Sequence, residues 1–227
     1  VRLPKDKQNP EAGTQMVETT PGRIIVNQLA PIEVPYINEI LGKKSLRKII
    51  SNVIKYTGVA RTAQFLDDIK NLGYTMAFKG GLSFNLGDVI IPEEKQSLIT
   101  NGYNTVEDIK ANFAMGFITN NERYNKVIDL WSSIDNKITK IVEQQISSDQ
   151  QGFNPVYMML DSGARGSTQQ IKQLCGMRGL MAKPQKSGGQ GAEIIENPII
   201  SNLKEGMSVL EYFISTHGAR KGLADTA

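Results

Sequence analysis

Hydrophobic residues recur every three or four positions through two long stretches of the chain, a spacing typical of amphipathic helices. In the first stretch this spacing predicts one helix over residues 43–57, which Gly58 ends, and a second over residues 61–72, which Gly73 ends. Shorter apolar runs predict extended segments, which are residues 23–27, 74–78 and 83–91. We therefore expect the first 98 residues to mix short strands and helices.

The second stretch predicts an antiparallel helical hairpin over residues 104–147. The apolar positions of its second helix alternate between steps of four and three, as in a coiled-coil seam: Val127, Trp131, Ile134, Ile138 and Ile141. The matching face of its first helix carries Val106, Ile109, Phe113 and Phe117. Thr119 and Glu122 have the spacing of a capping box, which places the turn near residues 116–121. The polar residues outside the seam favour a protruding docking device, and burial of both helices in a larger bundle is the alternative.

The composition is that of a folded protein of one or two domains. With 227 residues, of which 40% are hydrophobic and 22% charged, the chain is not a wholly disordered one. No apolar run approaches the roughly 18 residues that a membrane-spanning helix needs, so we expect no membrane association and a cytoplasmic location. The single cysteine, Cys175, excludes an internal disulfide and a cysteine-based zinc site. The single histidine, His217, leaves few options for His-dependent catalysis or metal binding.

Positive charge is concentrated between residues 161 and 186, although the net charge of the chain is only +3. This segment carries five Lys and Arg residues, four Gly and a single Asp. If Ser167 caps a helix, Arg165 and Lys172 lie near its N-terminal side, an arrangement typical of phosphate sites. A solvated basic face is the alternative interpretation. The glycine-rich residues 186–191 that follow predict a flexible connector.

Residues 209–227 have helical spacing, interrupted by Gly218 and Gly222, which indicates a helix that bends or accepts a close neighbour. Taken together, the patterns predict a mainly helical α+β fold. Its parts are a mixed strand and helix N-terminal region, an antiparallel helical hairpin, a basic glycine-rich loop region and a C-terminal bridge-type helix. The corresponding divisions are residues 1–98, 99–150, 151–206 and 207–227.

Four segments resemble, in order, parts of the largest (β′) subunit of bacterial DNA-dependent RNA polymerase. The sequence STHGARKGLADTA over residues 215–227 resembles the first half of its bridge helix. DSGARGS over 161–167 and GMRGLMAKP over 176–184 resemble its F-loop region. ERYNKVID over 122–129 is similar to the second rim helix at the mouth of the secondary channel. TTPGR over 19–23 is similar to the opening of the pore-forming domain.

The resemblance implies that the chain forms part of the wall of a channel, through which nucleoside triphosphates reach the active centre of a DNA-templated nucleotidyltransferase. It implies magnesium in the full enzyme, held by residues outside this sequence, so we expect no catalytic or metal residue here and an inactive isolated fragment. The implied partners are the β, α, ω and σ subunits, template DNA, RNA, nucleoside triphosphates and secondary-channel factors.

The resemblance also implies roles for individual residues. Those of the nucleotide channel are Arg165, Lys172, Arg178 and Met181. Those of the bridge helix and its nucleic-acid contacts are His217, Arg220, Lys221, Thr226 and Ala227. Those of factor or alarmone docking are Asn125, Lys126 and Asp129. The alternative function is a free-standing helical module that binds nucleic acid or protein through residues 161–186.

Overall fold

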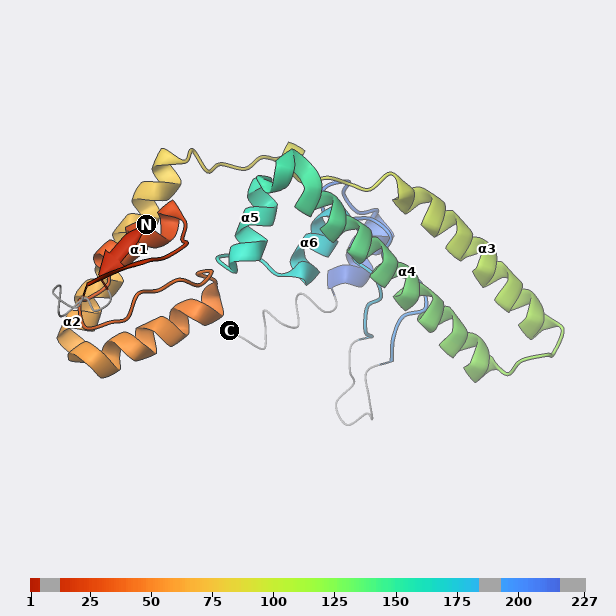
Figure 1. The fold of residues 1–227 in the computed structure, drawn as a ribbon. Coiled ribbons are helices and arrows are strands. Elements are labelled where there is room, and N and C mark those ends of the chain that lie inside the picture. The colour runs from red at the N-terminus through yellow and green to blue at the C-terminus, as the bar shows by residue number, and fades with distance from the viewer. Residues whose placement is uncertain (5–12, 184–192, 217–227) are drawn as a thin grey trace. The chain divides into compact units, whose positions relative to one another are not determined.

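The computed structural model describes residues 1–4, 13–183 and 193–216. The chain forms two compact units, the first made of Val1–Ser83 and Asp161–Ala164, the second of Phe84–Leu160 and Arg165–Ala227. The described residues are mainly helical and contain one two-stranded antiparallel sheet (Figure 1). The predicted α+β class with a helical majority is therefore confirmed. No helix in the described part of the chain is long and apolar enough to cross a membrane.

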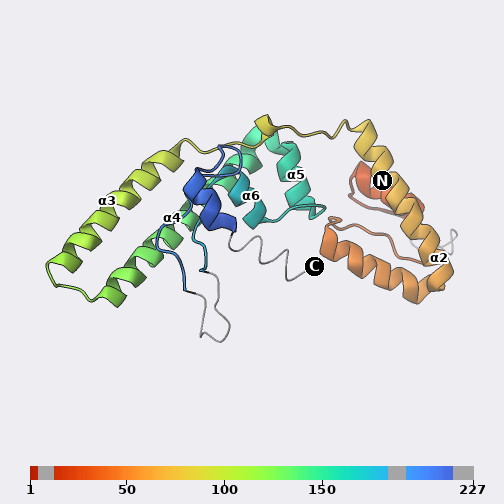
Figure 2. The ribbon, with the colours of Figure 1, turned by 180° about the vertical axis from the view of Figure 1, so that it is seen from behind.

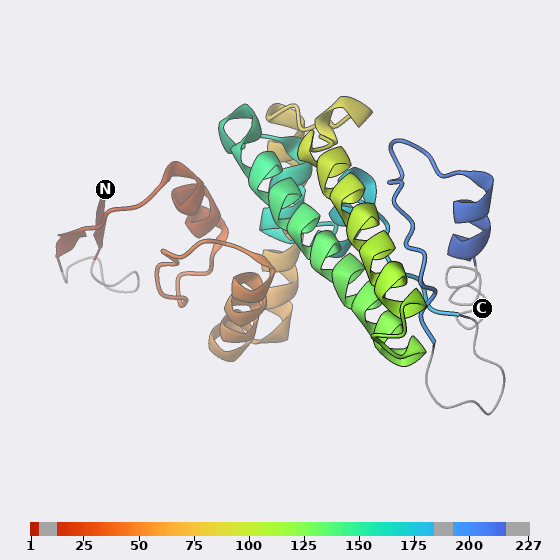
Figure 3. The same cartoon turned by 90° about the vertical axis from the view of Figure 1, so that its right-hand side faces the viewer.

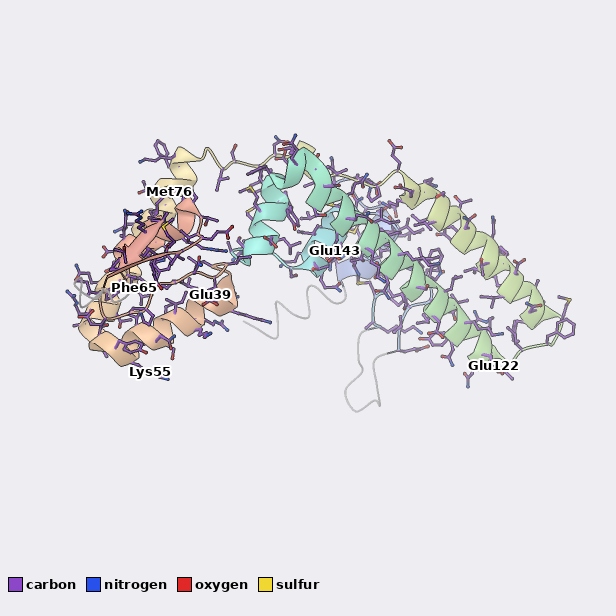
Figure 4. All side chains as sticks on the ribbon, viewed as in Figure 1. Glu39, Lys55, Phe65, Met76, Glu122 and Glu143 are labelled. Atoms are coloured by element: carbon purple, nitrogen blue, oxygen red, sulfur yellow. The ribbon has the colours of Figure 1, made fainter. Side chains whose placement is uncertain are left out.

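The first unit combines the small sheet with two helices (Figure 2). Strand β1 (Arg2–Pro4) pairs antiparallel with β2 (Thr14–Met16), and helices α1 (Pro21–Leu29) and α2 (Lys43–Lys79) follow. Its core is formed by buried side chains from α2 and the loop before it: Val34, Ile37, Ile49, Val53 and Phe65, the last of which Figure 4 labels.

The extended segment predicted at residues 23–27 is wrong, because these residues lie inside α1. Pro21 stands at the first helical position, where its fixed φ favours helix and its missing N–H costs nothing. The side chain of Asn27 then holds the following loop, donating to the carbonyl of Ile37 at 2.7 Å and accepting from the Ile37 N–H at 2.9 Å. A run of β-branched residues is therefore helical here because its flanking residues start and fasten a helix.

The break predicted at Gly58 is confirmed as a kink, since this glycine has φ +76° and lies between two helical stretches of α2. Gly73 does not end the second stretch, which continues to Lys79, so the extended segment predicted at residues 74–78 is also wrong. Residues 83–91 form no strand either. They contain a short 3-10 helix, Leu86–Asp88, with a capping box closed by Asn85.

The second unit contains the predicted hairpin, formed by α3 (Glu94–Ala114) and α4 (Asn120–Ser148), which lie side by side in Figure 3. The first helix begins ten residues earlier than the predicted hairpin start at residue 104. The predicted capping box is confirmed, because Thr119 N donates to Glu122 Oε2 at 2.7 Å and Glu122 N donates to Thr119 Oγ1 at 3.2 Å.

The predicted seam of α4 is confirmed in its first four positions, from Val127 to Ile138, which are buried. Its last predicted position, Ile141, is only half-buried, and the buried positions that continue the seam are Val142 and Ile146. The seam shifts because the second half of α4 packs on α6 (Thr168–Cys175) and the backbone after it. The end of the predicted α3 face is not buried: Phe113 and Phe117 are both exposed.

The region predicted as a basic glycine-rich loop contains regular structure. Helix α5 (Pro155–Ser162) precedes α6, and two isolated antiparallel bridges join Gly179 to Ile199 and Ala182 to Ile194. Residues 209–216 are helical, and residues 217–227, where the bridge-type helix is predicted to continue, lie outside the described residues.

Candidate functional site

Arg165 stands just before α6, in the turn that follows α5. Its backbone N–H donates to the Met159 carbonyl at 3.5 Å, and Gly166 beside it has φ +91°, a conformation that favours glycine. Ser167 then caps α6 by accepting from the Gln170 N–H, as its sequence position predicts. These contacts hold the backbone at Arg165 in place, and the Arg165 residue lines a groove.

That groove has a volume of about 770 Å³ and lies within the second unit. Most of its lining is apolar: Phe84, Leu86, Val89, Val156, Met159, Ile171, Leu174 and Leu203. Its lining includes two cationic residues, Arg165 and Lys204, and no Asp or Glu. Lys204 donates to the Val89 carbonyl at 2.6 Å. Neither cation has an ion-pair partner among the described residues, and the Arg165 side chain has no hydrogen-bond partner among them, so its guanidinium is available to an anion.

Lys172 has a different environment from Arg165. It is buried on α6, and its Nζ donates to Oδ2 of Asp135 on α4 at 2.7 Å. Gly179, with φ +88°, packs beside that carboxylate, where an added Cβ would stand 3.4 Å from Oδ2. The charge of Lys172 is thus balanced within the protein. Sequence reasoning missed Asp135, because a partner 37 residues away leaves no local signal.

Arg178 and Met181 lie on the segment that pairs with residues 194–201, and neither lines the groove. The backbone N–H of Arg178 donates to the Ser201 carbonyl at 3.2 Å, and its Nη1 lies 3.8 Å from Sδ of Met207. Its Nε is buried without a hydrogen-bond partner among the described residues. The structure therefore brings one of the four predicted channel residues, Arg165, into the groove.

The three predicted docking residues, Asn125, Lys126 and Asp129, are exposed on the first turns of α4. Next to them, Arg123 makes a two-pronged ion pair with Glu196, at 2.6 and 2.8 Å. The hydrogen bond from Arg123 lowers the pKa of Glu196 despite partial burial of that carboxylate.

Tyr124 completes the attachment of α4 to the segment around residues 194–196. Its hydroxyl donates to the Ile194 carbonyl at 2.9 Å and accepts from the Ile194 N–H at 3.1 Å. Sequence reasoning missed this contact, as it missed the partner of Arg123, because the residues involved are 70 or more positions apart. These hydrogen bonds and the ion pair join the start of α4 and residues 194–196 into one continuous surface.

The hairpin tip, residues 113–119, exposes apolar side chains. Phe117 is 73% exposed, Met115 59% and Phe113 41%. The guanidinium of Arg123 lies 5.7 Å from the centre of the Phe113 ring, within cation–π range. Three large apolar side chains are thus exposed to solvent at the hairpin tip, an arrangement that is typical of an interaction surface.

The predicted bridge-helix residues lie outside the described residues: His217, Arg220, Lys221, Thr226 and Ala227. In the described ranges, no group of three or more His, Cys, Asp or Glu side chains is arranged to hold a metal ion.

Two family models match the chain. RNA polymerase Rpb1, domain 3, matches residues 2–89, and RNA polymerase Rpb1, domain 4, matches residues 118–204. Among curated proteins, the DNA-directed RNA polymerase subunit beta′ of Parabacteroides distasonis is 69% identical over 212 residues, which are 93% of this chain and 15% of that protein. The same subunit of Bacteroides fragilis is 70% identical over 212 residues, again 93% of this chain and 15% of the relative.

A more distant relative, subunit beta′ of Flavobacterium psychrophilum, is 61% identical over 213 residues, 94% of this chain and 15% of that protein. The chain therefore spans about 15% of the length of the curated relatives that it matches. Similarity at this level extends through both compact units and through the hairpin, the groove and the turn at Arg165. The chain thus belongs to the family of bacterial DNA-directed RNA polymerase β′ subunits.

Proposed function

We propose that this chain lines the secondary channel of a DNA-directed RNA polymerase and guides nucleoside triphosphates toward the active centre. The observation that supports it is the position of Arg165, a cation without an ion-pair partner in the part of the chain that the structure describes, on a hydrogen-bonded turn beside an apolar groove whose lining has no Asp or Glu. Apolar walls weaken the screening by water, so a guanidinium there attracts a polyanion more strongly than it does in bulk solvent.

Arg165 suits a triphosphate because a guanidinium presents several N–H donors in a planar fork that can bind two phosphate oxygens at once. Lys172 does not compete for the same anion, because Asp135 already balances its charge. We propose that the magnesium ions of DNA-templated RNA synthesis are held by other parts of the polymerase, as the resemblance implies. This chain supplies binding and guidance, and it works with the β, α, ω and σ subunits, template DNA and RNA.

The test is Arg165→Ala in the β′ subunit of an assembled polymerase, assayed by single-nucleotide addition. Loss of a charge-assisted contact is worth about 1.5–3 kcal/mol, or roughly 10- to 150-fold in kcat/KM for the nucleotide. Arg165→Lys keeps the charge and should recover part of this loss. The matched control is Lys140→Ala, which removes an exposed cation from α4. An unchanged kcat/KM in Arg165→Ala would refute the proposed guidance.

The hairpin supports a second role, as a platform for proteins that enter the secondary channel. The favouring observation is the exposed apolar tip, Phe113, Met115 and Phe117, beside the exposed docking residues of α4. Phe117→Asp should abolish the response to transcript-cleavage or stress factors while leaving basal RNA synthesis intact, because Phe117 is exposed and lies outside the core. Equal loss of basal synthesis and factor response would contradict the platform role.

A further inference from the structure

A single carboxylate joins the start of the C-terminal helical segment, residues 209–216, to the segment at residues 199–202. Oε1 of Glu211 accepts from the backbone N–H groups of Ile200 and Ser201, both at 3.2 Å. Oε2 of Glu211 accepts from Ser201 Oγ at 2.8 Å and from the Ser208 N–H at 2.9 Å. Four donors from two separate segments therefore converge on one side chain.

Within its own helix, Glu211 belongs to a capping box. Its backbone N–H donates to Ser208 Oγ at 3.3 Å while its carboxylate accepts from the Ser208 N–H, the reciprocal pattern of an N-cap and the third helical residue. An ordinary capping box satisfies only groups at its own helix end. Glu211 differs because it also accepts three donors from Ile200 and Ser201, which fixes the helix start to a neighbouring segment.

The segment that Glu211 holds is itself fixed. Ile199 is fully buried and exchanges two backbone hydrogen bonds with Gly179, each 2.9 Å long. Asn202 is also fully buried, and its side-chain amide donates to the carbonyls of Cys175 and Gly176 at the end of α6. Residues 199–202 thus form a rigid base, and Glu211 is the side chain that ties the helix to it.

The hydrogen bonds need an ionised carboxylate. Burial alone would raise the pKa of Glu211, but hydrogen bonds from Ser208 and Ser201 outweigh it and lower the pKa to about 2. No Lys or Arg among the described residues forms an ion pair with it, so N–H and O–H donors alone balance its charge. Glutamine cannot replace it fully, because an amide offers one acceptor oxygen where the carboxylate offers two.

We propose that Glu211 is a positioning residue for nucleotide addition: it sets the direction in which the helix beginning at residue 209 leaves residues 199–202. This proposal rests on the proposed function, in which the chain lines the way to the active centre, and on the resemblance of residues 215–227 to the first half of the bridge helix. A misdirected helix would leave triphosphate entry past Arg165 unchanged and would lower the rate of the step that follows binding.

The experiment uses the assembled polymerase carrying full-length β′ with Glu211→Ala, Glu211→Gln or Ser201→Ala. In single-nucleotide addition, Glu211→Ala should lower kcat about tenfold, with KM for the nucleotide changed less than about twofold. Glu211→Gln should lie between Glu211→Ala and the unaltered enzyme, and Ser201→Ala, which removes one of the four donors, should have the smallest effect. The matched control is Glu143→Gln, an exposed position on α4 that Figure 4 labels.

An unchanged kcat in Glu211→Ala, with only a lower melting temperature or assembly yield, would overturn the proposal, because Glu211 would then be merely structural. A higher KM for the nucleotide with an unchanged kcat in Glu211→Ala would overturn it too, because the defect would then lie in nucleotide binding. The two proposals can fail separately. A reduced kcat in Glu211→Ala combined with normal kinetics in Arg165→Ala would refute triphosphate guidance and leave the positioning role standing.

Discussion

At the scale of single residues, the cations of the basic segment fall into different environments. Lys172 is buried against Asp135, and Lys183 pairs with Glu193 at 2.8 Å on the surface. Arg165 lines the groove without an ion-pair partner among the described residues. A charge count over residues 161–186 treats these positions alike, whereas the structure separates Arg165, which lines the groove, from Lys172 and Lys183, whose charges are balanced within the protein.

The stability of the protein should respond differently to single and double substitution of the buried Lys172–Asp135 ion pair. Lys172→Ala leaves the Asp135 carboxylate buried without its cation, so the free energy of unfolding should fall by about 3 kcal/mol. Lys172→Met combined with Asp135→Leu removes both charges and should recover most of that loss. Denaturant unfolding of each variant measures this, and a single substitution that costs less than about 0.5 kcal/mol would show the pair to be unimportant.

The thiol of Cys175 should be unreactive in the folded protein. Burial raises its pKa to about 11, against a small opposing effect of Lys204, so at pH 8 the thiolate that reacts with disulfide reagents is scarce. We expect slow labelling by a chromogenic disulfide in native conditions and fast labelling in denaturant. Rates that are equal in the two conditions would contradict the buried position.

At the scale of elements, the hairpin is predictable from the sequence because its signals are local. The Thr119–Glu122 box and the first seam positions from Val127 onward depend on neighbours one to four residues apart, and both are confirmed. The strand predicted at residues 23–27 is wrong because a short β-branched run fits a helix as well as a strand, and Pro21 decides between them. The partners of Lys172 and Arg123 could not be predicted, since they are brought together only by packing.

The approach of α3 to α4 depends on Gly102. A Cβ there would stand 2.5 Å from Cδ1 of Ile134 and 3.2 Å from the Trp131 ring, which already makes a T-shaped contact with the Tyr103 ring. Gly102→Ala gains about 1 kcal/mol of helix propensity, but overpacking costs about 1–3 kcal/mol, so the variant should be destabilised. Gly73→Ala on α2 meets no atom within 4 Å and should be stabilised by up to about 1 kcal/mol. Thermal unfolding of both variants tests the contrast, and a stabilised Gly102→Ala would contradict the close packing.

At the scale of the whole molecule, a polymerase segment and a free-standing nucleic-acid-binding module make different predictions. A module that neutralises several phosphates of a single strand loses affinity steeply with salt, because log K falls by about 0.7 per phosphate for each unit of log salt concentration. Because Lys172 and Lys183 are already paired, this chain should bind RNA weakly, with a slope of about 1 or less. Salt titration with a fluorescent RNA measures the slope, and a steep one would favour the independent module.

The most direct measurement maps which parts of this chain lie near the catalytic metal of the assembled polymerase. Ferrous iron in place of magnesium generates hydroxyl radicals that cut nearby backbone. If Arg165 guides triphosphates to the metal, cuts should occur at residues 161–168 and be suppressed when a nucleotide occupies the site. Cuts confined to the hairpin tip or to α2, with none near Arg165, would contradict the proposed function.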